Sequence, residues 1–290
     1  MRSSFTKNGP RLLVRLWFPF IVLVLIFSIF WFGAHSHTTE LSQNEQRYGE
    51  AYWVFHRQLN EFGAVAKGDV LRHMLTRHTR SVLEFGCSGG LIVAGLPKGL
   101  EKYCVEVNPL ARKHAENLDA LKQHVFARVP HRLRVDFIYS TSVLEHCDCP
   151  MCELEKLKRA LLPGGTLLIG VRNDGRDPGQ TFESFRSDPN HHIYTWNELL
   201  LANLLSSAGL IPCGVVGQWE AWHGPMTIEN YEADKMAYCM KGLEVGERQR
   251  VYYIWSVAVL PGDENRCEDM RTRLADLQGC KYLQHKGLPM

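Results

Sequence analysis

The strongest constraint on the fold of this chain is a series of short apolar runs separated by longer segments of helical composition. The runs recur roughly every 20 to 30 residues, at 82–85, 103–107, 135–139 and 166–171. Strands that are apolar along their whole length belong to parallel sheets covered on both faces, and their alternation with helices is typical of β-α-β units. The sequence therefore predicts a doubly wound α/β sheet, with two further strands at 210–216 and 251–260.

Helix signals lie before and between these runs. Pro109 suits the first turn of a helix, and a second helix is expected over 153–162. Between 46 and 77, apolar residues at three- and four-residue spacing predict two amphipathic helices, broken near 63–68. Residues 217–246 show no regular pattern.

One segment does not have the composition of a globular domain. Residues 16–34 carry no charge over 19 positions, and a helix of that length covers about 28 Å, close to the hydrocarbon thickness of a bilayer. A secretory signal has a shorter apolar region and a small-x-small cleavage site, for which this segment offers a poor match. We therefore expect an uncleaved, single-pass signal-anchor.

The charges around this segment predict its orientation. Four basic residues precede it, whereas the first acidic residue, Glu40, follows it, so the positive-inside rule keeps the N-terminus in the cytoplasm. The remaining chain would then face the lumen of an endoplasmic reticulum or Golgi type of membrane, or the exterior. A mitochondrial membrane is the alternative, because the first 39 residues lack acids and contain arginine and serine.

The expected organisation has five parts. They are a basic cytoplasmic N-terminus (1–15), a transmembrane helix (16–34), a polar tether (35–46), a folded domain that includes N-terminal helices (47–265), and a C-terminal helix and tail (266–290). The 33 Lys and Arg nearly balance the 31 Asp and Glu, with no long run of one sign after the N-terminal end. We therefore expect no nucleic-acid partner.

Nine cysteines are present, and most lie singly in apolar runs, where a buried thiol packs as a small apolar group. Cys147, Cys149 and Cys152 lie close together, and a disulfide, a metal site and free thiols all remain open for them. A structural zinc needs a second pair of ligands at suitable spacing, which is not evident. His191 and His192 are adjacent in an extended segment and would point in opposite directions, so we predict no metal site.

A glycine-rich turn follows the first apolar run. Gly86 permits a tight bend, and Gly89 and Gly90 remove side chains where a ligand would approach the main chain. In an open parallel sheet, ligands bind at this carboxyl end of the strands. Glu84, at the end of the run, is badly placed for a pyrophosphate and well placed for an ammonium group.

The next apolar run ends in a second acid. Glu106 lies 20 residues after Gly86, and at that distance a carboxylate accepts hydrogen bonds from a ribose diol. The dinucleotide fingerprint G-x-G-x-x-G fails at Ser88 and Leu91. An amine and a ribose without phosphates describe S-adenosylmethionine.

With these motifs in order, the chain resembles the class I S-adenosylmethionine-dependent methyltransferases of the small-molecule type. The resemblance covers about 80–215 and rests on LEFGCSGG (83–90), VEVNP (105–109), VLEH (143–146), LLPGG (161–165) and HIYTW (192–196). It implies a Rossmann-like, mostly parallel seven-stranded sheet with helices on both faces, here preceded by a single transmembrane helix. The implied cofactor is S-adenosyl-L-methionine.

The resemblance also implies roles for particular residues. The methionine part of the cofactor would contact Glu84 and the turn that contains Gly86, Cys87 and Gly90. Glu106 would bind the ribose, and Ser140 or Thr141 would lie beside the methionine part or the transferred methyl group. Ser88 departs from the glycine of many members, which is tolerable if its φ stays negative.

Two histidines are candidates for catalysis. Neutral imidazole can accept a hydroxyl proton near pH 7, so His146 and His192 are candidate general bases, with the ordering of loops as the alternative role. We expect a membrane-tethered methyltransferase that acts on a hydroxyl or carboxyl of a small molecule, glycan or lipid. The alternatives are an inactive interaction protein with the same fold and a nicotinamide-dependent oxidoreductase.

Overall fold

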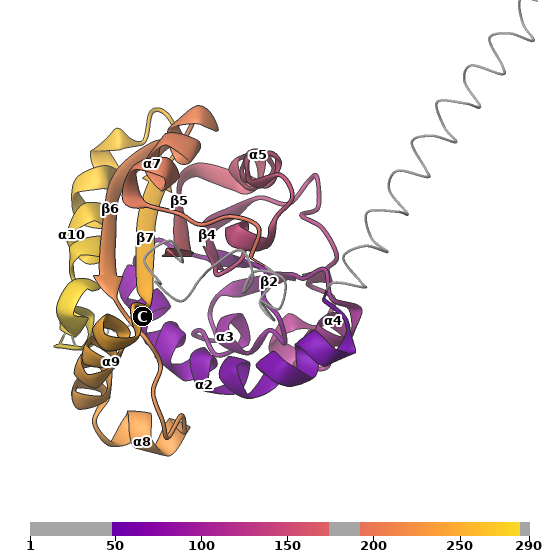
Figure 1. Cartoon of the computed structure of the whole chain (residues 1–290). Coiled ribbons are helices and arrows are strands. Elements are labelled where there is room, and N and C mark those ends of the chain that lie inside the picture. The colour runs from indigo at the N-terminus through magenta and orange to yellow at the C-terminus, as the bar shows by residue number, and fades with distance from the viewer. Residues whose placement is uncertain (1–47, 174–191, 285–290) are drawn as a thin grey trace, which may run out of the picture. The chain divides into compact units, whose positions relative to one another are not determined.

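A seven-stranded sheet forms the centre of the computed structural model, which describes residues 48–173 and 192–284 (Figure 1). The strands are β1 (Ser81–Phe85), β2 (Glu101–Val105), β3 (Val125–Phe126), β4 (Val135–Thr141), β5 (Leu161–Asn173), β6 (Ile211–Trp219) and β7 (Tyr252–Val259). Their order is β3-β2-β1-β4-β5-β7-β6. β1 to β5 pair in parallel, whereas β7 is antiparallel to both of its neighbours. The prediction of a mostly parallel seven-stranded sheet is confirmed.

Helices cover both faces of this sheet (Figure 1). They are α2 (Glu50–Met74), α3 (Leu91–Ala94), α4 (Pro109–Glu116), α5 (Pro150–Ala160), α7 (Glu198–Ser207), α8 (Ile228–Ala233), α9 (Lys235–Gln249) and α10 (Cys267–Ala275). α4 begins at the expected Pro109, after Asn108, whose side chain accepts hydrogen bonds from the N–H groups of Leu110 and Ala111. This cap fixes the direction in which the chain leaves β2.

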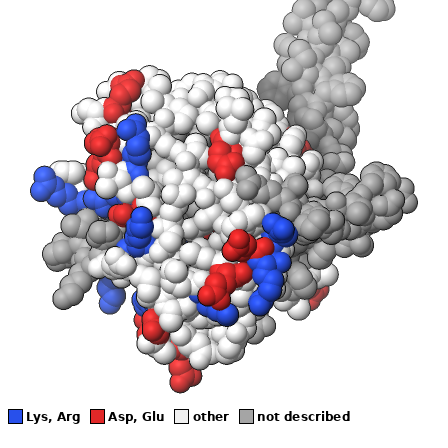
Figure 2. All heavy atoms as spheres, turned by 60° about the vertical axis from the view of Figure 1, so that its left-hand side comes forward, with Lys and Arg blue, Asp and Glu red and all other residues white. Residues whose placement is uncertain are grey.

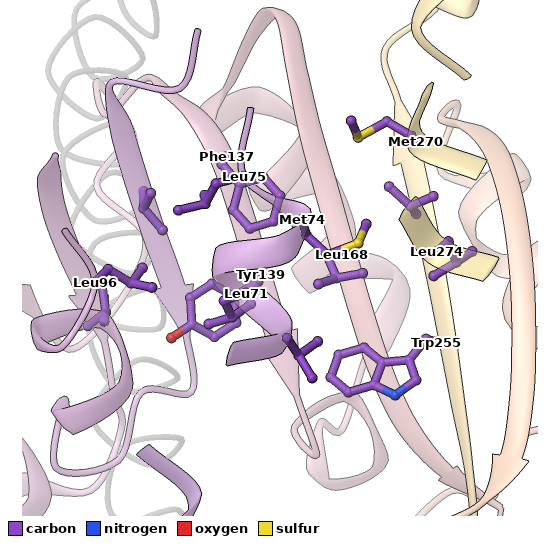
Figure 3. Close-up of a cluster of buried hydrophobic side chains, with 14 of the residues drawn as sticks. Leu71, Met74, Leu75, Leu96, Phe137, Tyr139, Leu168, Trp255, Met270 and Leu274 are labelled. Carbon is purple, nitrogen blue, oxygen red and sulfur yellow. The ribbon is translucent and has the colours of Figure 1, made fainter. Parts of the chain in front are cut away.

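Two apolar clusters divide between the faces of the sheet. One joins α2 and α10 to β4, β5 and β7. Figure 3 shows Leu71 and Met74 of α2, and Leu75 directly after it, close to Phe137 and Leu168 of the strands. The other joins α5 and α7 to the opposite face. Burial of apolar side chains on both faces explains why the strand sequences are apolar along their length.

The expected break in the N-terminal helices is absent, because α2 continues through Gly63 and Gly68. A glycine inside a helix costs about 1 kcal/mol relative to alanine, which packing can offset. At Gly63 a Cβ atom would lie 2.7 Å from the ring of Trp222. The glycine therefore makes room for this indole, and its position in the sequence was wrongly interpreted as a helix end.

The segment 217–246 is more regular than its sequence indicates. β6 extends to Trp219, and α8 and most of α9 follow. Gly242 on α9 accepts a hydrogen bond from the N–H of Ala221 at 3.1 Å, and a Cβ atom at Gly242 would lie 3.0 Å from the Ala221 carbonyl. Close packing of α9 against the backbone at Ala221 thus explains why position 242 is a glycine, within a segment whose sequence shows no regular pattern.

Eight of the nine cysteines form four disulfides, and Cys147 is free. The pairs are Cys87–Cys104, Cys149–Cys152, Cys213–Cys267 and Cys239–Cys280, with Cα atoms between 4.7 and 6.1 Å apart. This range is normal for protein disulfides. From the sequence, a disulfide was an open alternative only for Cys147, Cys149 and Cys152, and most of the other cysteines were expected to be buried thiols.

Residues 47–290 form one compact unit. Among residues 48–173 and 192–284, no helix is long and apolar enough to cross a membrane. The predicted transmembrane helix at 16–34 and the tether at 35–46 lie outside the described residues and stay predictions. On the face drawn in Figure 2, acidic and basic side chains are interspersed.

Candidate cofactor and acceptor site

The turn after β1 bends through three residues with positive φ. These are Gly86 at +78°, Ser88 at +49° and Gly90 at +74°. The left-handed region suits glycine and is unfavourable for most other residues. The condition under which a serine would be tolerated here, a negative φ, is therefore not met: Ser88 adopts a backbone conformation that favours glycine.

The glycines of this turn are also required by their surroundings. A Cβ atom at Gly86 would clash with the side chain of Val143, in the loop after β4. A Cβ atom at Gly89 would lie 2.8 Å from the ring of Trp53 and 3.0 Å from His114. The backbone of the turn thus lies between the β4 loop, α4 and the first turns of α2.

Glu84 lies at the end of β1, opposite Cys104 of β2 and Tyr139 of β4. Its side chain is 2 % exposed, and its Oε2 accepts a hydrogen bond from the N–H of Val93 in α3 at 3.2 Å. The carboxyl group is therefore directed toward the helix that follows the glycine turn. Burial raises the pKa of Glu84 to about 8, although Tyr139, Val93 and Lys67 act in the opposite direction.

Glu106 connects the turn to the end of β2. Its Oε2 accepts from the N–H of Ser88 and its Oε1 from the N–H of Asn108, both at 2.8 Å. Burial raises the pKa of Glu106, and these amides partly offset the effect. A carboxylate has about four acceptor positions, so two hydrogen bonds leave room for the two hydroxyls of a ribose.

Cys87, the residue between Gly86 and Ser88, is bound to Cys104 of β2. The N–H groups of Gly86 and Cys87 both donate to the carbonyl of Val105, at 2.8 and 3.1 Å. The turn is therefore attached to the end of β2 by a covalent bond and by hydrogen bonds. The sequence placed Cys87 at the cofactor but did not predict this bond.

Ser140 lies near the carboxyl end of β4 and is 1 % exposed. Among the described residues its Oγ has no hydrogen-bond partner. An unpaired buried hydroxyl is costly, which a polar ligand group at this edge of the sheet would relieve. The three side chains of Glu84, Glu106 and Ser140 thus belong to the ends of three neighbouring strands.

This arrangement fits S-adenosylmethionine. A buried carboxyl at a glycine turn suits an ammonium group, and a second carboxyl with free acceptor positions on the next strand suits a ribose. On the side of α2, the indole of Trp53 packs against Gly89 and limits the space beside the turn. A cofactor would therefore be enclosed between the strand ends and α2.

Sequence reasoning missed Lys67, which lies on α2 among apolar neighbours. Its Nζ donates to Thr141 Oγ1 at 3.3 Å and lies 5.6 Å from the ring centre of Trp222 and 5.4 Å from that of Tyr253. Burial lowers the pKa of Lys67, and the carboxyls of Glu220, Glu145 and Glu84 oppose this effect in that order. The sequence did contain a signal for this residue, because a lysine on the buried side of a predicted amphipathic helix is unusual.

The two candidate catalytic histidines come together beside the carboxyl end of β4. The rings of His146 and His192 are 4.8 Å apart between centroids and inclined at 66°. The ring of Tyr48 meets His146 edge-on at 5.7 Å, and the hydroxyl of Tyr48 donates to the carbonyl of His146 at 3.3 Å. Both imidazoles therefore lie at the same edge of the sheet as the cofactor turn, the edge formed by the carboxyl ends of the parallel strands. His191 lies outside the described residues.

Comparison with known proteins agrees with this geometry. Residues 55–211, more than half of the chain, match the sequence profile of a family described as a methyltransferase domain. The matched range contains the glycine turn, both carboxyls, Ser140 and both histidines. A search of curated proteins finds no significant match.

Solved structures share the fold at low sequence identity. A chain from the complex of the Haloferax volcanii Trm112 methyltransferase activator with a methyltransferase has a TM-score of 0.53 and 17 % identity, over 73 % of this chain and 95 % of that one. The N-methyltransferase NodS from Bradyrhizobium japonicum, solved with S-adenosyl-L-homocysteine, has a TM-score of 0.44 and 18 % identity, over 66 % and 84 %. The first of these likenesses supports the fold alone, and the second is too low to support an argument.

The family match and the site together identify the class of this protein. The chain belongs to the S-adenosylmethionine-dependent methyltransferases of class I, and its cofactor is S-adenosyl-L-methionine.

Proposed function

We propose that the chain is an active methyltransferase, tethered to a membrane by residues 16–34, that methylates a hydroxyl or carboxyl group of a small molecule, glycan or lipid. The observation that carries the activity is the pair of carboxyls around the glycine turn, where Glu106 accepts the Ser88 amide and Glu84 is buried at the start of the same turn. Such a pair matches the amine and the ribose of the cofactor.

The bound cofactor supplies an electrophilic methyl group. Transfer to an acceptor oxygen depends mostly on alignment, because holding two reactants in line removes much of the entropic barrier. Lys67, Thr141 and Tyr253 surround one side of the region at the ends of β4 and β7. His146 or His192 would accept the proton of a hydroxyl acceptor.

The acceptor class follows from the tether and from the breadth of the family. Lys67 adds a reason to expect an acceptor with negative charge or several oxygens, because its ammonium group is a donor next to the site. Incubation of the full-length chain with methyl-labelled cofactor and fractionated cell extracts tests the activity. Label should enter an oxygen-bearing acceptor with the native chain and not with Glu84→Ala.

The four disulfides support a location outside the cytosol. Disulfides persist in oxidising compartments and are rare in cytosolic proteins, in line with an N-terminus in the cytoplasm and a domain in the lumen of the endoplasmic reticulum or Golgi. A mitochondrial membrane stays the alternative. Protease added to sealed vesicles should leave the domain intact; complete digestion would contradict the luminal orientation.

An inactive interaction protein is the second candidate, favoured by the position of Trp53 against Gly89 and by the side chain at Ser88. Calorimetric titration with S-adenosylmethionine distinguishes the two candidates. Micromolar binding supports the enzyme, and no binding supports the inactive protein. A parallel titration with reduced nicotinamide cofactor tests the oxidoreductase alternative, which the family match does not favour.

A further inference from the structure

Three potential metal ligands converge beside the carboxyl end of β4. One ligand atom from each of Glu145, His146 and His192 lies within 4.8 Å of the others. Glu145 is fully buried, whereas both histidines are partly exposed. The set is therefore closed on one side by the protein and open to small solutes on the other.

The backbone holds these residues together although 46 positions separate the two histidines. Glu145 and His146 belong to a short 3-10 turn, Leu144–His146, directly after the loop of β4. The carbonyl of Glu145 accepts hydrogen bonds from the N–H groups of Ile193 and Tyr194, at 2.7 and 3.1 Å. This double contact fixes the start of the segment that carries His192 against the turn.

The chemistry of the three side chains matches a transition-metal site. A cation beside the buried carboxylate of Glu145 would gain a strong electrostatic attraction in this low-dielectric environment. Two imidazoles and one carboxylate are a known ligand set for zinc sites that keep a position open, and for other divalent transition metals. We propose that Glu145, His146 and His192 bind one divalent transition-metal cation. This revises the expectation of no metal, which considered His192 only with its neighbour.

The geometry needs little adjustment to close around an ion. Bonds of about 2.0–2.2 Å to nitrogen and oxygen place ligand atoms about 3 to 4 Å apart. The present separation of at most 4.8 Å is larger by about 1 to 2 Å, within the reach of side-chain rotation. The planes of the two imidazole rings are inclined at 66°, so the rings do not stack face to face.

Two tyrosines pack against His146 from outside the ligand set. Tyr48 donates to the His146 carbonyl and packs edge-on against its ring. Tyr52 packs edge-on against the same ring at 6.5 Å between centroids. These contacts restrict the rotation of the His146 ring, and they come from Tyr48, just before α2, and from Tyr52 in its first turn.

The role of the cation rests on the proposed function and takes the place of the general-base role given above to His146 and His192, because an imidazole nitrogen that binds a metal cannot accept a proton. Val143, two residues before Glu145, packs against Gly86 of the cofactor turn, so the ligand set lies near this turn. Three protein ligands leave a position for an oxygen of the acceptor. The cation would therefore hold the oxygen-bearing acceptor in place, and favour acceptors with a carboxylate or paired hydroxyls over simple amines.

Metal binding can be measured without any methyl transfer. We would strip the full-length chain in detergent with a chelator, then titrate it with Zn²⁺ in a calorimeter and with Co²⁺ by visible absorption. The variants are His192→Ala, His146→Ala and Glu145→Gln, with His192→Asp to retain a ligand. His78→Ala is the control, because this exposed histidine precedes β1, at the opposite end of the strands.

The native chain and His78→Ala should bind one equivalent, and each of the three ligand variants should lose at least about 10-fold in affinity, with partial recovery in His192→Asp. Affinity unchanged in His192→Ala and His146→Ala, or no stoichiometric binding by the native chain, overturns the proposal. Titration of the stripped chain with S-adenosylmethionine is run beside it. Cofactor binding without metal binding refutes the metal site alone, and the reverse refutes the proposed enzyme.

Discussion

Replacing Glu84 by glutamine should make the cofactor-free protein more stable and the cofactor complex weaker. The pKa of Glu84 rises from 4.5 in the unfolded chain to about 8 in the fold, mainly because of burial. An acid whose folded-state pKa is raised contributes most stability below its unfolded pKa, and the fold loses stability as the pH increases from about 4.5 to about 8.

The magnitude follows from the size of the shift. One pKa unit corresponds to about 1.4 kcal/mol, so the native chain should lose about 2.5 kcal/mol of unfolding free energy between about pH 5 and about pH 7 through this group. Glu84→Gln keeps an acceptor for the N–H of Val93 and removes the ionisation. The variant should therefore lack this part of the pH dependence.

Chemical denaturation of native and variant chains at the two pH values measures the difference, and other titrating groups cancel in the comparison. Glu116→Gln, an exposed acid on α4, is the matched control and should behave like the native chain. Equal pH dependence in native and Glu84→Gln chains would refute the reasoning that burial controls this carboxyl.

Cofactor binding gives a second measure of the same group. An ammonium group beside Glu84 favours its ionised form, so binding at about pH 7 should release about one proton, detected as a heat that varies with buffer ionisation enthalpy. In Glu84→Gln the release should vanish, and affinity should fall about 10- to 100-fold with loss of a charge-assisted hydrogen bond. Native binding without proton release would place the amine elsewhere.

Three further perturbations test other parts of the structure. Gly86→Ala should lower the unfolding free energy by more than about 2 kcal/mol, because Gly86 has a positive φ and its new Cβ atom would clash with Val143. Adding Val143→Ala should recover part of this loss. Gly99→Ala should be neutral, because a Cβ atom at Gly99 has no neighbour within 4 Å. The disulfide Cys213–Cys267 joins positions 54 residues apart, and replacing both cysteines by alanine should lower the unfolding free energy by about 4 kcal/mol. Alkylation of the unreduced, denatured chain should label only Cys147. Labelling of further cysteines would contradict the pairing. Deletion of residues 1–34 should yield a soluble, folded domain that still binds cofactor, and an aggregated product by size-exclusion chromatography would contradict the tether.

The site residues on the strands could be predicted because they follow from local pattern. In a parallel sheet all strands place their carboxyl ends at one edge, so Glu84, Glu106 and Ser140 had to lie near one another once the strands were recognised. The glycine turn was equally visible in the sequence, but the positive φ of Ser88 and the hydrogen bond from its N–H to Glu106 were not.

The sequence by itself determined the sheet, because apolar runs and their spacing record burial on both faces of each strand. Tertiary structure alone decided the contacts between distant segments: the unbroken α2 with Lys67, the pairing of eight cysteines, and the meeting of His192 with Glu145 and His146. The physical reason is that such contacts depend on how helices and loops pack across the sheet, and residue spacing along the chain carries no information about that packing.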